Sequence, residues 1–310
     1  MDEFELIRRY FQALTPPRRD VRLGIGDDAA LLKIPTGHEL VVTTDTLVAG
    51  RHFAEDAAAD DIGWKSLAVN LSDLAAMGAE PRWFTLALTL RLADPLWLKG
   101  FAEGLRASAA AAQVTLVGGD TTQGPLSITI TAMGTLPAGR AIRRSGARAG
   151  DAICVTGTLG DAALALELGT QAPAALRQRL NRPMPRLKGG RVLRGIAHAA
   201  IDLSDGLAGD LGHILEASGA GADVHIPRLP ASTDFSRYAP PETRLRLQAT
   251  GGDDYELCFC LPKSKLDAVR RRLGVPVTEI GRVTQLRGLR FLDAAGKPVP
   301  LALQGYRHFT

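Results

Sequence analysis

The chain has 310 residues, a formal net charge of +4 and an isoelectric point of 9.1; 45% of its residues are hydrophobic and 23% are charged. This composition is typical of a folded globular protein and excludes a disordered chain. No stretch approaches the roughly 18 apolar residues of a membrane span, and the N-terminus is acidic where a signal peptide is basic, so we expect a cytoplasmic protein. The basic residues are scattered along the chain, which disfavours nucleic-acid binding. There are three cysteines and no CxxC pair, which disfavours a disulfide framework and a zinc site.

The chain begins with an amphipathic helix and continues into an acidic, glycine-containing loop. Apolar residues at helical spacing predict a helix over residues 2–14, and two prolines end it. Residues 24–29, Gly-Ile-Gly-Asp-Asp-Ala, match the dinucleotide fingerprint in its GxGxxA form. We reject that function because Asp27 and Asp28 would face the pyrophosphate, and like charges about 4 Å apart repel by about 4 kcal/mol at an effective dielectric constant of about 20. Cations would bridge the two, so the segment is interpreted as a metal-carboxylate loop.

Residues 40–53 change abruptly from apolar, β-branched residues to polar ones. Residues 40–42 predict a buried strand, and Thr43, Thr44 and Asp45 then place hard oxygen ligands at its carboxyl end. Mg²⁺ prefers such oxygens and usually keeps waters and substrate phosphates as its other ligands. The alternative for these three residues is a strand-end cap or turn.

A long helix is predicted from Asp60 to about Gly78, with a continuous apolar stripe. Asn70 and Asp73 are three residues apart and therefore share one face of this helix. Polar residues among small apolar ones in the middle of a helix are a local conflict of the kind that marks functional sites. The alternative, a solvated Asp73, is disfavoured because its neighbours in the sequence are apolar.

Two strands with a helix between them follow, over residues 83–90, 95–112 and 114–117. Residues 118–122 then supply two glycines, which let backbone amides approach a ligand, and Asp120 with two threonines, which again offer hard oxygens. A tight turn is the alternative for this segment. Residues 127–133 alternate between apolar and polar residues and predict the strand that closes this half of the chain.

A basic, glycine-rich segment, residues 138–150, predicts a linker between two domains. The N-terminal domain, 1–137, is expected to bind metal and nucleotide. The C-terminal domain, 151–310, is predicted to alternate helices and strands, with strands over 151–156 and 257–261 and a helix that ends near Ala199.

Two acidic segments in the C-terminal half lie beside short apolar runs. Period-2 spacing places Asp202 and Ser204 on one side of the first segment, and Asp205 follows just before a helix. The second segment, Gly-Gly-Asp-Asp-Tyr-Glu at 251–256, precedes a predicted strand. Cys258 and Cys260 are expected on one buried face of that strand.

Acidic residues with neighbouring hydroxyls or glycines therefore recur along a chain that is basic overall. Together they predict a magnesium cluster that receives a polyphosphate. The chain has no GxxxxGK[ST] P-loop and none of the protein-kinase motifs, so a phosphoryl-transfer enzyme of this sequence would hold its nucleotide through metals and glycine-flanked loops.

Motifs across essentially the whole chain resemble those of the thiamine-monophosphate kinase family, in the same order. They are GIGDDAALL, TTDTLVAGRHF, AVNLSDLAAMGAEP, GGDTTQGPLSIT, RRSGARAGD, VTGTLGD, IDLSDGLAGDLGHI, GGDDYELCF and GYRHF. The resemblance implies transfer of the γ-phosphoryl group of ATP to thiamine monophosphate. It also implies the two-domain α/β (α+β) fold of the aminoimidazole-ribonucleotide-synthetase-like superfamily, with N-terminal sheets pairing across a homodimer.

The resemblance also assigns residues to ligands, motif by motif. The implied magnesium ligands are Asp28, Thr43, Thr44, Asp45, Asp73, Asp120, Asp202 and Asp205. The implied ATP contacts are Gly119, Asp120, Arg144 and Ser204, and the implied thiamine monophosphate contacts are His52, Asp253 and Tyr306. The chain departs from its relatives where they often have glutamate at position 253 and where residues 109–112, all alanines, lie at a place that can offer an aromatic.

The expected mechanism is in-line transfer without a covalent enzyme intermediate. The attacking phosphate oxygen has a second pKa near 6 and is largely deprotonated at neutral pH, so no general base is required. Catalysis then consists of positioning and charge neutralisation, for which Asp45, Asp120 and Arg144 are the candidate catalytic residues. His52 is expected to orient the substrate, with a plain loop histidine as the alternative. Tyr306 offers a π face to the cationic thiazolium, with C-terminal packing as the alternative.

Other members of the superfamily and one different class are rival interpretations. The selenophosphate-forming enzymes resemble one another in a reactive cysteine or selenocysteine near the N-terminus, and the hydrogenase-maturation relatives end in a cysteine. The first cysteine here is Cys154, and the chain ends at Thr310, so both are disfavoured. A non-catalytic Mg-nucleotide sensor would need the same carboxylates but no second substrate.

Overall fold

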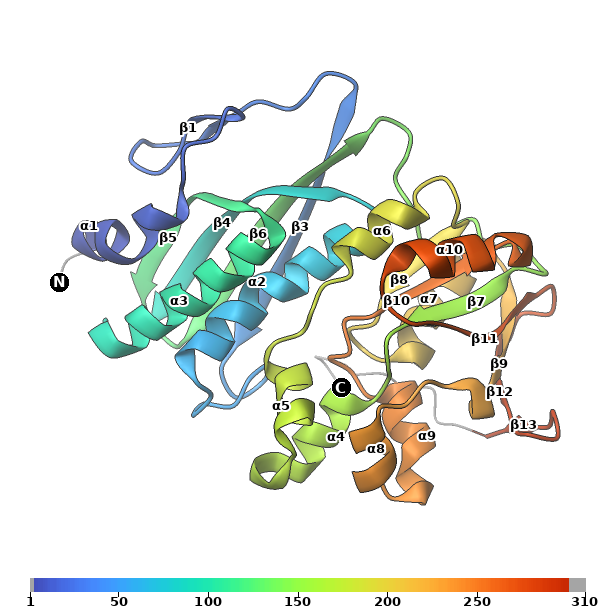
Figure 1. The fold of residues 1–310 in the computed structure, drawn as a ribbon. Helices are drawn as coiled ribbons and strands as arrows, with labels where there is room; N and C mark the ends of the chain where they lie inside the picture. The colour runs from blue at the N-terminus through green and yellow to red at the C-terminus, as the bar shows by residue number, and fades with distance from the viewer. Residues whose placement is uncertain (1–2, 301–310) are drawn as a thin grey trace. The chain divides into compact units, whose positions relative to one another are not determined.

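The computed structural model describes residues 3–300 of the chain and forms two compact units (Figure 1). The first unit contains the residues up to Leu74 and Ala79–Gly139, and the second contains Ala75–Gly78 and the chain from Arg140 onward. The split falls within residues 138–150, whose role as a linker stays a prediction.

The first unit contains a mixed sheet, with antiparallel and parallel strand pairs, and two long helices. Its four-stranded sheet has the order β3-β6-β4-β5, and β1 and β2 form a separate pair. The elements are α1 (Glu3–Leu6), η1 (Ile7–Phe11), η2 (Gln12–Leu14), β1 (Val21–Leu23), β2 (Leu31–Leu32), β3 (His38–Val48), α2 (Ala59–Ala76), β4 (Glu80–Leu90), α3 (Pro95–Ala112), β5 (Thr115–Gln123) and β6 (Ser127–Pro137).

The expectation that the strand ends at residue 42 is wrong, because β3 continues to Val48. It pairs antiparallel with β6 over its whole length, from His38 opposite Pro137 to Val48 opposite Ser127. The hydrogen bonds of the partner strand extend β3 through Thr43, Thr44 and Asp45, which neither cap it nor turn.

The tight-turn alternative for residues 118–122 is also wrong, because these residues belong to β5. They pair in parallel with β4, where Gly119 lies opposite Leu86. A Cβ atom at Gly119 would lie 1.9 Å from the backbone oxygen of Leu86, so only glycine permits this close approach of the two strands.

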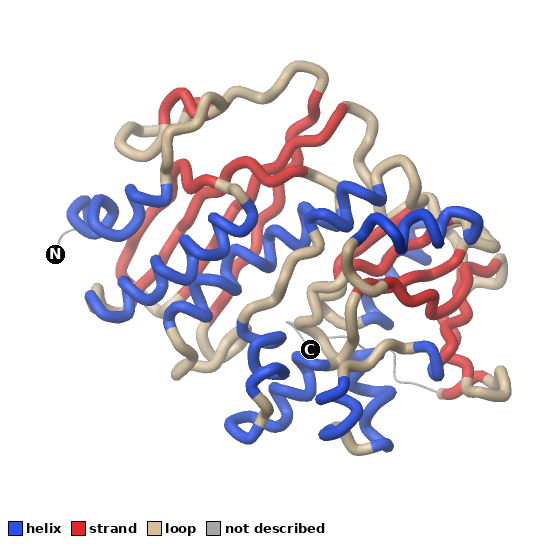
Figure 2. Tube along the Cα trace, viewed as in Figure 1, coloured by secondary structure: helices blue, strands red, loops and turns tan. Residues whose placement is uncertain are grey.

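Helices α2 and α3 lie side by side over one face of the four-stranded sheet (Figures 1 and 2). They approach closely at two glycines, since a Cβ at Gly63 would meet the backbone of Phe101 and one at Gly104 would meet that of Asp60. The opposite face of β3 carries Leu40 and Val42, which are 42% and 54% exposed. Within the first unit as described, the sheet therefore has one face covered by helices, while β3 carries exposed apolar side chains on the other.

The second unit contains a seven-stranded sheet of order β13-β12-β9-β11-β7-β10-β8, in which β9 and β12 pair in parallel. Its elements are β7 (Ala152–Thr156), α4 (Asp161–Leu168), η3 (Gly169–Gln171), α5 (Ala174–Asn181), α6 (Leu187–Leu193), β8 (Ala199–Asp202), α7 (Leu207–Ser218), β9 (Gly221–His225), η4 (Ile226–Arg228), α8 (Thr233–Tyr238), α9 (Pro241–Thr250), β10 (Leu257–Leu261), η5 (Lys263–Lys265), α10 (Leu266–Leu273), β11 (Val277–Thr284), β12 (Gly288–Leu292) and β13 (Pro298–Val299). The helix expected to reach Ala199 ends earlier, at Leu193, and residue 199 begins β8.

This sheet is buried on both faces, as the alternation along β10 shows. Cys258 and Cys260 pack into one apolar core with α7, whereas Phe259 packs into another with α6 and α10. The prediction that the two cysteines share a buried face is confirmed. The mixed helix-and-sheet architecture of both units confirms the predicted α/β fold class.

The three cysteines are free thiols, and we predict that they are unreactive in the folded protein. Burial raises the pKa of Cys154 to about 12 and raises the pKa values of Cys258 and Cys260 as well, so the nucleophilic thiolate is suppressed in mildly alkaline buffer. Iodoacetamide should label none of them before denaturation and all of them in denaturant, as read by intact mass. Rapid labelling of the native protein would contradict this burial.

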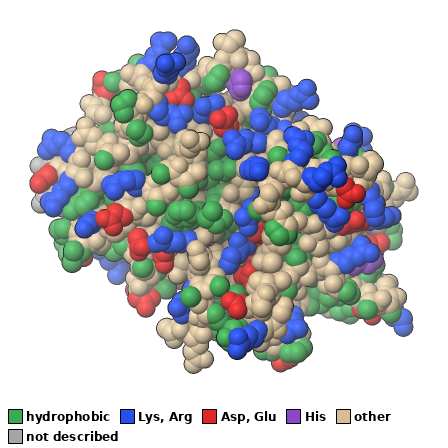
Figure 3. Space-filling view, viewed as in Figure 1, with side chains coloured by type: hydrophobic (Ala, Val, Ile, Leu, Met, Phe, Trp, Pro, Cys, Tyr) green, Lys and Arg blue, Asp and Glu red, His purple; other side chains and the backbone are tan. Residues whose placement is uncertain are grey.

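No helix within residues 3–300 has the length and apolar character needed to span a membrane. On the face drawn in Figure 3, Lys and Arg side chains gather in the upper right part and are mixed with Asp and Glu elsewhere.

Candidate functional site

A cleft of about 790 Å³ in the first unit brings together two of the acidic segments found in the sequence. One wall is the loop from Gly24 to Ala30, which contributes Asp27 and Asp28. The other is β5, which contributes Gly119 and Asp120. Three of the sequence-predicted ligand residues, Asp28, Gly119 and Asp120, therefore line one cleft although about 90 residues of chain separate them.

The chain forms these two walls for local reasons. Gly26 has φ +122°, a conformation that residues with a side chain rarely adopt, and the Asp28 amide donates to Asp27 Oδ1 at 2.9 Å. On the other wall, glycine at position 119 lets β5 lie against β4 without a clash. Backbone amides and carboxylates thus border the same space, which suits a metal-bridged polyphosphate.

A second group of polar residues joins β3 to α2. The Thr43 hydroxyl donates to Asp73 Oδ2 at 2.6 Å, and the Asp45 amide donates to Asn70 Oδ1 at 3.1 Å. Asn70 is fully buried and also donates to the Ser66 carbonyl, so it links the helix to the strand. The polar residues in the middle of α2 thus hydrogen-bond to β3. Asn70 has a structural role at this site, although the sequence did not predict that it binds a ligand.

Thr44 lies on the opposite face of β3 from Thr43 and Asp45. Its hydroxyl is 2.9 Å from that of Thr131, next to a matching pair between Thr46 and Thr129 at 2.8 Å. Alternation along a strand separates these side chains, so the Thr44 hydroxyl does not share the face that carries the other candidate ligands.

Mg²⁺ fits the chemistry of these donors. Within residues 3–300, no group of three or more His, Cys, Asp or Glu side chains is arranged to hold a metal ion by itself. Mg²⁺ usually takes one or two carboxylates and completes its shell with water and substrate phosphates, and Asp28 and Asp120 of the cleft are carboxylates of this kind.

His52 lies in a turn that follows β3. Its Nδ1 accepts a hydrogen bond from the Val48 amide at 3.0 Å, and its carbonyl accepts one from Lys65 Nζ at 3.2 Å. Because Nδ1 is the acceptor, the hydrogen of the neutral ring lies on Nε2. The assignment of His52 as a substrate contact stays a prediction.

Arg144 is exposed in a segment whose backbone is tied to α7. The amides of Gly146 and Ala147 donate to Ser218 Oγ at 3.2 and 3.1 Å, and the same hydroxyl donates to the Arg144 carbonyl at 3.4 Å. The segment places a guanidinium at the surface of the second unit, where it is available to an anion.

In the second unit, a buried carboxylate that the sequence did not single out organises the predicted ligands. Asp210 Oδ2 accepts hydrogen bonds from the amides of Ser204, Asp205 and Gly206, each at 3.1 Å. Burial, followed by the charge of Asp205, raises the pKa of Asp210 to about 7. Its sequence signals are its position near the start of a predicted helix and its place in the motif IDLSDGLAGDLGHI.

The Ser204 loop is joined to the segment that carries Asp253. The Asp253 amide donates to the Ser204 carbonyl at 2.9 Å, so a predicted ATP contact and a predicted acceptor contact are neighbours in the second unit. Asp202 ends β8 and is buried. Tyr306 lies outside the described residues.

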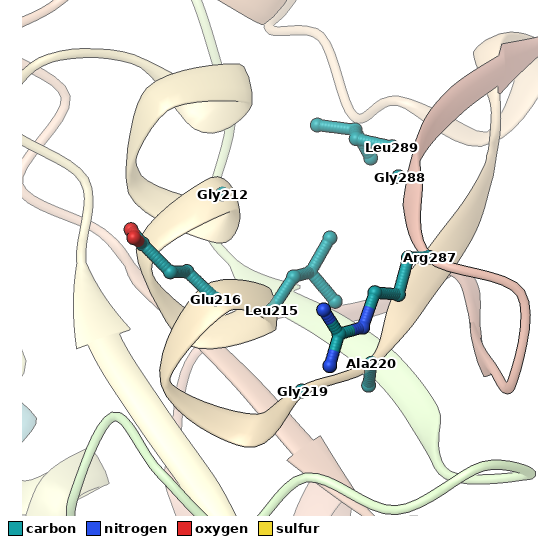
Figure 4. Close-up of a pocket in the computed structure, with 8 residues that line it drawn as sticks. All are labelled: Gly212, Leu215, Glu216, Gly219, Ala220, Arg287, Gly288 and Leu289. Carbon is teal, nitrogen blue, oxygen red and sulfur yellow. The ribbon is translucent and has the colours of Figure 1, made fainter.

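A smaller pocket in the second unit contains none of the predicted ligands. It has a volume of about 320 Å³ and lies between the end of α7 and β12 (Figure 4). Leu215 and Leu289 line it, with Glu216 and Arg287 at its sides. The sequence-predicted chemistry is therefore located elsewhere.

Comparison with known families assigns both halves of the chain. Residues 26–136 match the family described as AIR synthase related protein, N-terminal domain, and residues 148–293 match the AIR synthase related protein, C-terminal domain. Together these matches include most of the candidate ligands in both units.

Individual relatives are similar over nearly the whole chain. The thiamine-monophosphate kinase of Escherichia coli (strain K12) is 49% identical over 321 residues, covering 99% of this chain and 98% of that protein. The crystal structure of thiamine-monophosphate kinase from Stenotrophomonas maltophilia K279a has 47% identity and a TM-score of 0.89, covering 96% of this chain and 98% of that one. AaThiL complexed with AMPPCP and TMP has 30% identity and a TM-score of 0.79, covering 99% and 97% of the two chains. On sequence and fold together, the chain belongs to the thiamine-monophosphate kinase family.

Proposed function

We propose that this protein transfers the γ-phosphoryl group of ATP to thiamine monophosphate and so forms thiamine diphosphate. The observation that carries the proposal is the 49% identity to a thiamine-monophosphate kinase over 99% of the chain. The complex of AaThiL with AMPPCP and TMP, an ATP analogue and a second ligand, supports a reaction with two substrates.

Nucleotide binding is proposed to use the glycine-flanked carboxylates together with Mg²⁺. Gly119, Asp120, Arg144 and Ser204 are the proposed ATP contacts. The proposed metal ligands are Asp28, Thr43, Thr44, Asp45, Asp73, Asp120, Asp202 and Asp205. Bound Mg²⁺ would neutralise charge on the phosphates and so reduce the repulsion between ATP and thiamine monophosphate, both of which are anions. Thr44 is the weakest member of the set, because its hydroxyl bonds to Thr131 on the other face of β3.

The acceptor is proposed to be held by His52, Asp253 and Tyr306. Because Nδ1 of His52 accepts the Val48 amide, the hydrogen of the neutral ring is on Nε2, and an N–H group of this kind suits a phosphate oxygen. Since the attacking phosphate oxygen is already deprotonated at neutral pH, transfer proceeds in line without a base. Asp45 and Asp120 would act by holding Mg²⁺ near the phosphates, and Arg144 would stabilise the negative charge of the phosphoryl group during transfer.

The division of labour between the halves follows the same proposal. Residues 1–137 form the metal-binding, ATP-binding and dimerisation domain, residues 138–150 the linker, and residues 151–310 the C-terminal domain. We also propose a cytoplasmic location, since the phosphoryl donor is ATP and the cysteines are free thiols.

A homodimer formed through the exposed sheet face is the proposed assembly. Leu40, Val42 and Val48 leave apolar surface on the face of β3 opposite α2, beside the threonine pairs with β6. We predict that Val42→Lys converts the protein to a monomer, because a lysine would bury its charge in a sheet-to-sheet contact. The measurement is molar mass by light scattering.

The matched control is Leu96→Lys, which places the same charge on an exposed leucine of α3 in the same unit. It should leave the mass unchanged. A wild-type monomer, or equal masses for Val42→Lys and wild type, would contradict the proposed interface.

The reaction is tested by incubating the protein with ATP and Mg²⁺, with and without thiamine monophosphate. Equal amounts of ADP and of thiamine diphosphate, identified by mass, are expected only with thiamine monophosphate, and a chelator should abolish both. ATP binding with no product under any of these conditions would favour a Mg-nucleotide sensor and overturn the proposal.

A further inference from the structure

The segment Gly251–Glu256, which carries Asp253, contains two residues in an unfavourable backbone conformation. Asp253 has φ +66° and Tyr255 has φ +48°. A positive φ is uncommon for aspartate and a clear outlier for a bulky residue such as tyrosine. Such a conformation persists only where the surrounding structure holds it in place.

Backbone and side-chain contacts on either side of the segment hold it. The amides of Asp253 and Tyr255 donate to the carbonyls of Ser204 and Leu203, at 2.9 and 2.7 Å. Between them, the buried Asp254 carboxylate accepts the Gly160 amide at 3.0 Å. Each strained residue is thus fixed to the loop before α7, and the residue between them to the start of α4.

Arg179 of α5 donates hydrogen bonds both to the backbone of this segment and to the side chain at its end. It donates to the Asp254 carbonyl at 3.3 Å and to Glu256 Oε1 at 2.8 Å, and its Nε lies 3.8 Å from Asp161 Oδ2. Both hydrogen bonds come from Nη2, so the tip of Arg179 links the backbone in the middle of the strained segment to the side chain at its end. Lysine is one atom shorter and lacks a second nitrogen to face Asp161, so it cannot reproduce this arrangement.

Glu256, which accepts one of these hydrogen bonds from Arg179, is fully buried and is itself fixed by further contacts. Its carboxylate accepts hydrogen bonds from Thr156 Oγ1 and from Arg186 Nε, both at 2.6 Å, and Arg186 makes a further bond to it. Burial acts to lower the pKa of Arg179, but the charges of Glu256, Asp254 and Asp161 outweigh it and raise the pKa overall. The guanidinium stays charged at every working pH.

From this geometry we propose that Arg179, anchored by Glu256, is a positioning residue that holds the 253–255 backbone so that Asp253 meets the acceptor substrate. The inference rests on the proposed function, in which Asp253 contacts thiamine monophosphate. Arg179 makes no contact with substrate in this role and acts only through the loop.

The kinetic test compares Arg179→Lys with Arg177→Lys. Arg177 lies on the same helix but donates to the carbonyls of Ala172 and Thr170, away from the strained segment, so it is a matched control. Arg179→Lys should raise KM for thiamine monophosphate by about tenfold or more, since a misplacement of about 1 Å can cost about a hundredfold. KM for ATP should stay unchanged, as should both constants in Arg177→Lys.

A double-variant cycle then asks whether Arg179 acts through Asp253. In an Asp253→Asn background, Arg179→Lys should add no further increase in KM for thiamine monophosphate. Glu256→Gln, which keeps the shape of the side chain but removes the charge that anchors Arg179, should reproduce the effect in a second variant should Arg179→Lys fail to fold. Additive effects in the cycle, or equal rises in both KM values, would overturn the proposal.

Hydrogen exchange separates this inference from the proposed function. Arg179→Lys should speed exchange of the Asp253 and Tyr255 amides in the full chain, whereas Arg177→Lys should not. If Arg179→Lys speeds exchange but the wild-type protein forms no thiamine diphosphate, the proposed function is overturned, and the role of Arg179 in positioning Asp253 for that substrate is overturned with it. Product formation by wild type with unchanged exchange and unchanged KM in Arg179→Lys would overturn the positioning role alone.

Discussion

Replacing Asp45 with asparagine is expected to lower kcat by about a hundredfold to a thousandfold, the range typical of removing one group that stabilises the transition state electrostatically. Asparagine keeps the size of the side chain but cannot neutralise a cation. The contact of residue 45 with Asn70 runs through its backbone amide, and β3 pairs with β6 through its backbone as well, so asparagine can keep both of these contacts. The measurement is kcat at saturating Mg²⁺ and both substrates.

The comparison variant is His52→Ala, for which a smaller loss is expected. Its main effect should be a raised KM for thiamine monophosphate, because the variant removes the Nε2–H donor and the acceptor of the Val48 amide but no charge on the phosphates. Asp56→Asn, at an exposed position before α2, is the control for the loss of one carboxylate and should match wild type. Equal losses for Asp45→Asn and His52→Ala, or a larger loss for the histidine variant, would contradict the roles assigned to both.

Gly119→Ala is expected to destabilise the first unit by about 3 kcal/mol, a sum of typical costs for backbone strain and overpacking. The new Cβ would lie 1.9 Å from the Leu86 backbone oxygen, so β5 must move away from β4. Because Gly119 and Asp120 line the cleft with Asp28, ATP binding should weaken at the same time. Unfolding in denaturant and calorimetric titration of ATP with Mg²⁺ measure the two effects.

The adjacent residue provides the control. A Cβ at Gly118 would meet no atom within 4 Å, and its φ is not in the left-handed region, so Gly118→Ala should be close to wild type in stability. Similar losses in the two variants would mean that the close approach of β5 to β4 does not set the cost. Full ATP affinity in Gly119→Ala would separate this strand pairing from nucleotide binding.

The sequence was sufficient for elements that are specified locally and for the family. Helix α3 runs from Pro95 to Ala112 and β10 from Leu257 to Leu261, as predicted, because caps, prolines and periodicity within each segment specify them. The ordered motifs also sufficed to identify the family. Asn70 and Asp73 were recognised as a conflict within an apolar helix, and the contacts of both with β3 show its cause.

The tertiary structure decided where strands end and which distant groups meet. Thr43, Thr44 and Asp45 look like a strand terminus in sequence, but β6 supplies hydrogen bonds that carry β3 on to Val48, and the pleat then turns Thr44 away. Arg179 lies in none of the family motifs, and Asp210 lies in one, IDLSDGLAGDLGHI, that does not by itself reveal its contacts. The role of Asp210 arises from its contacts with the amides of residues 204–206. The role of Arg179 arises from its contact with Glu256, which lies 77 residues further along the chain. Such pairings depend on how the whole chain packs, which local periodicity does not encode.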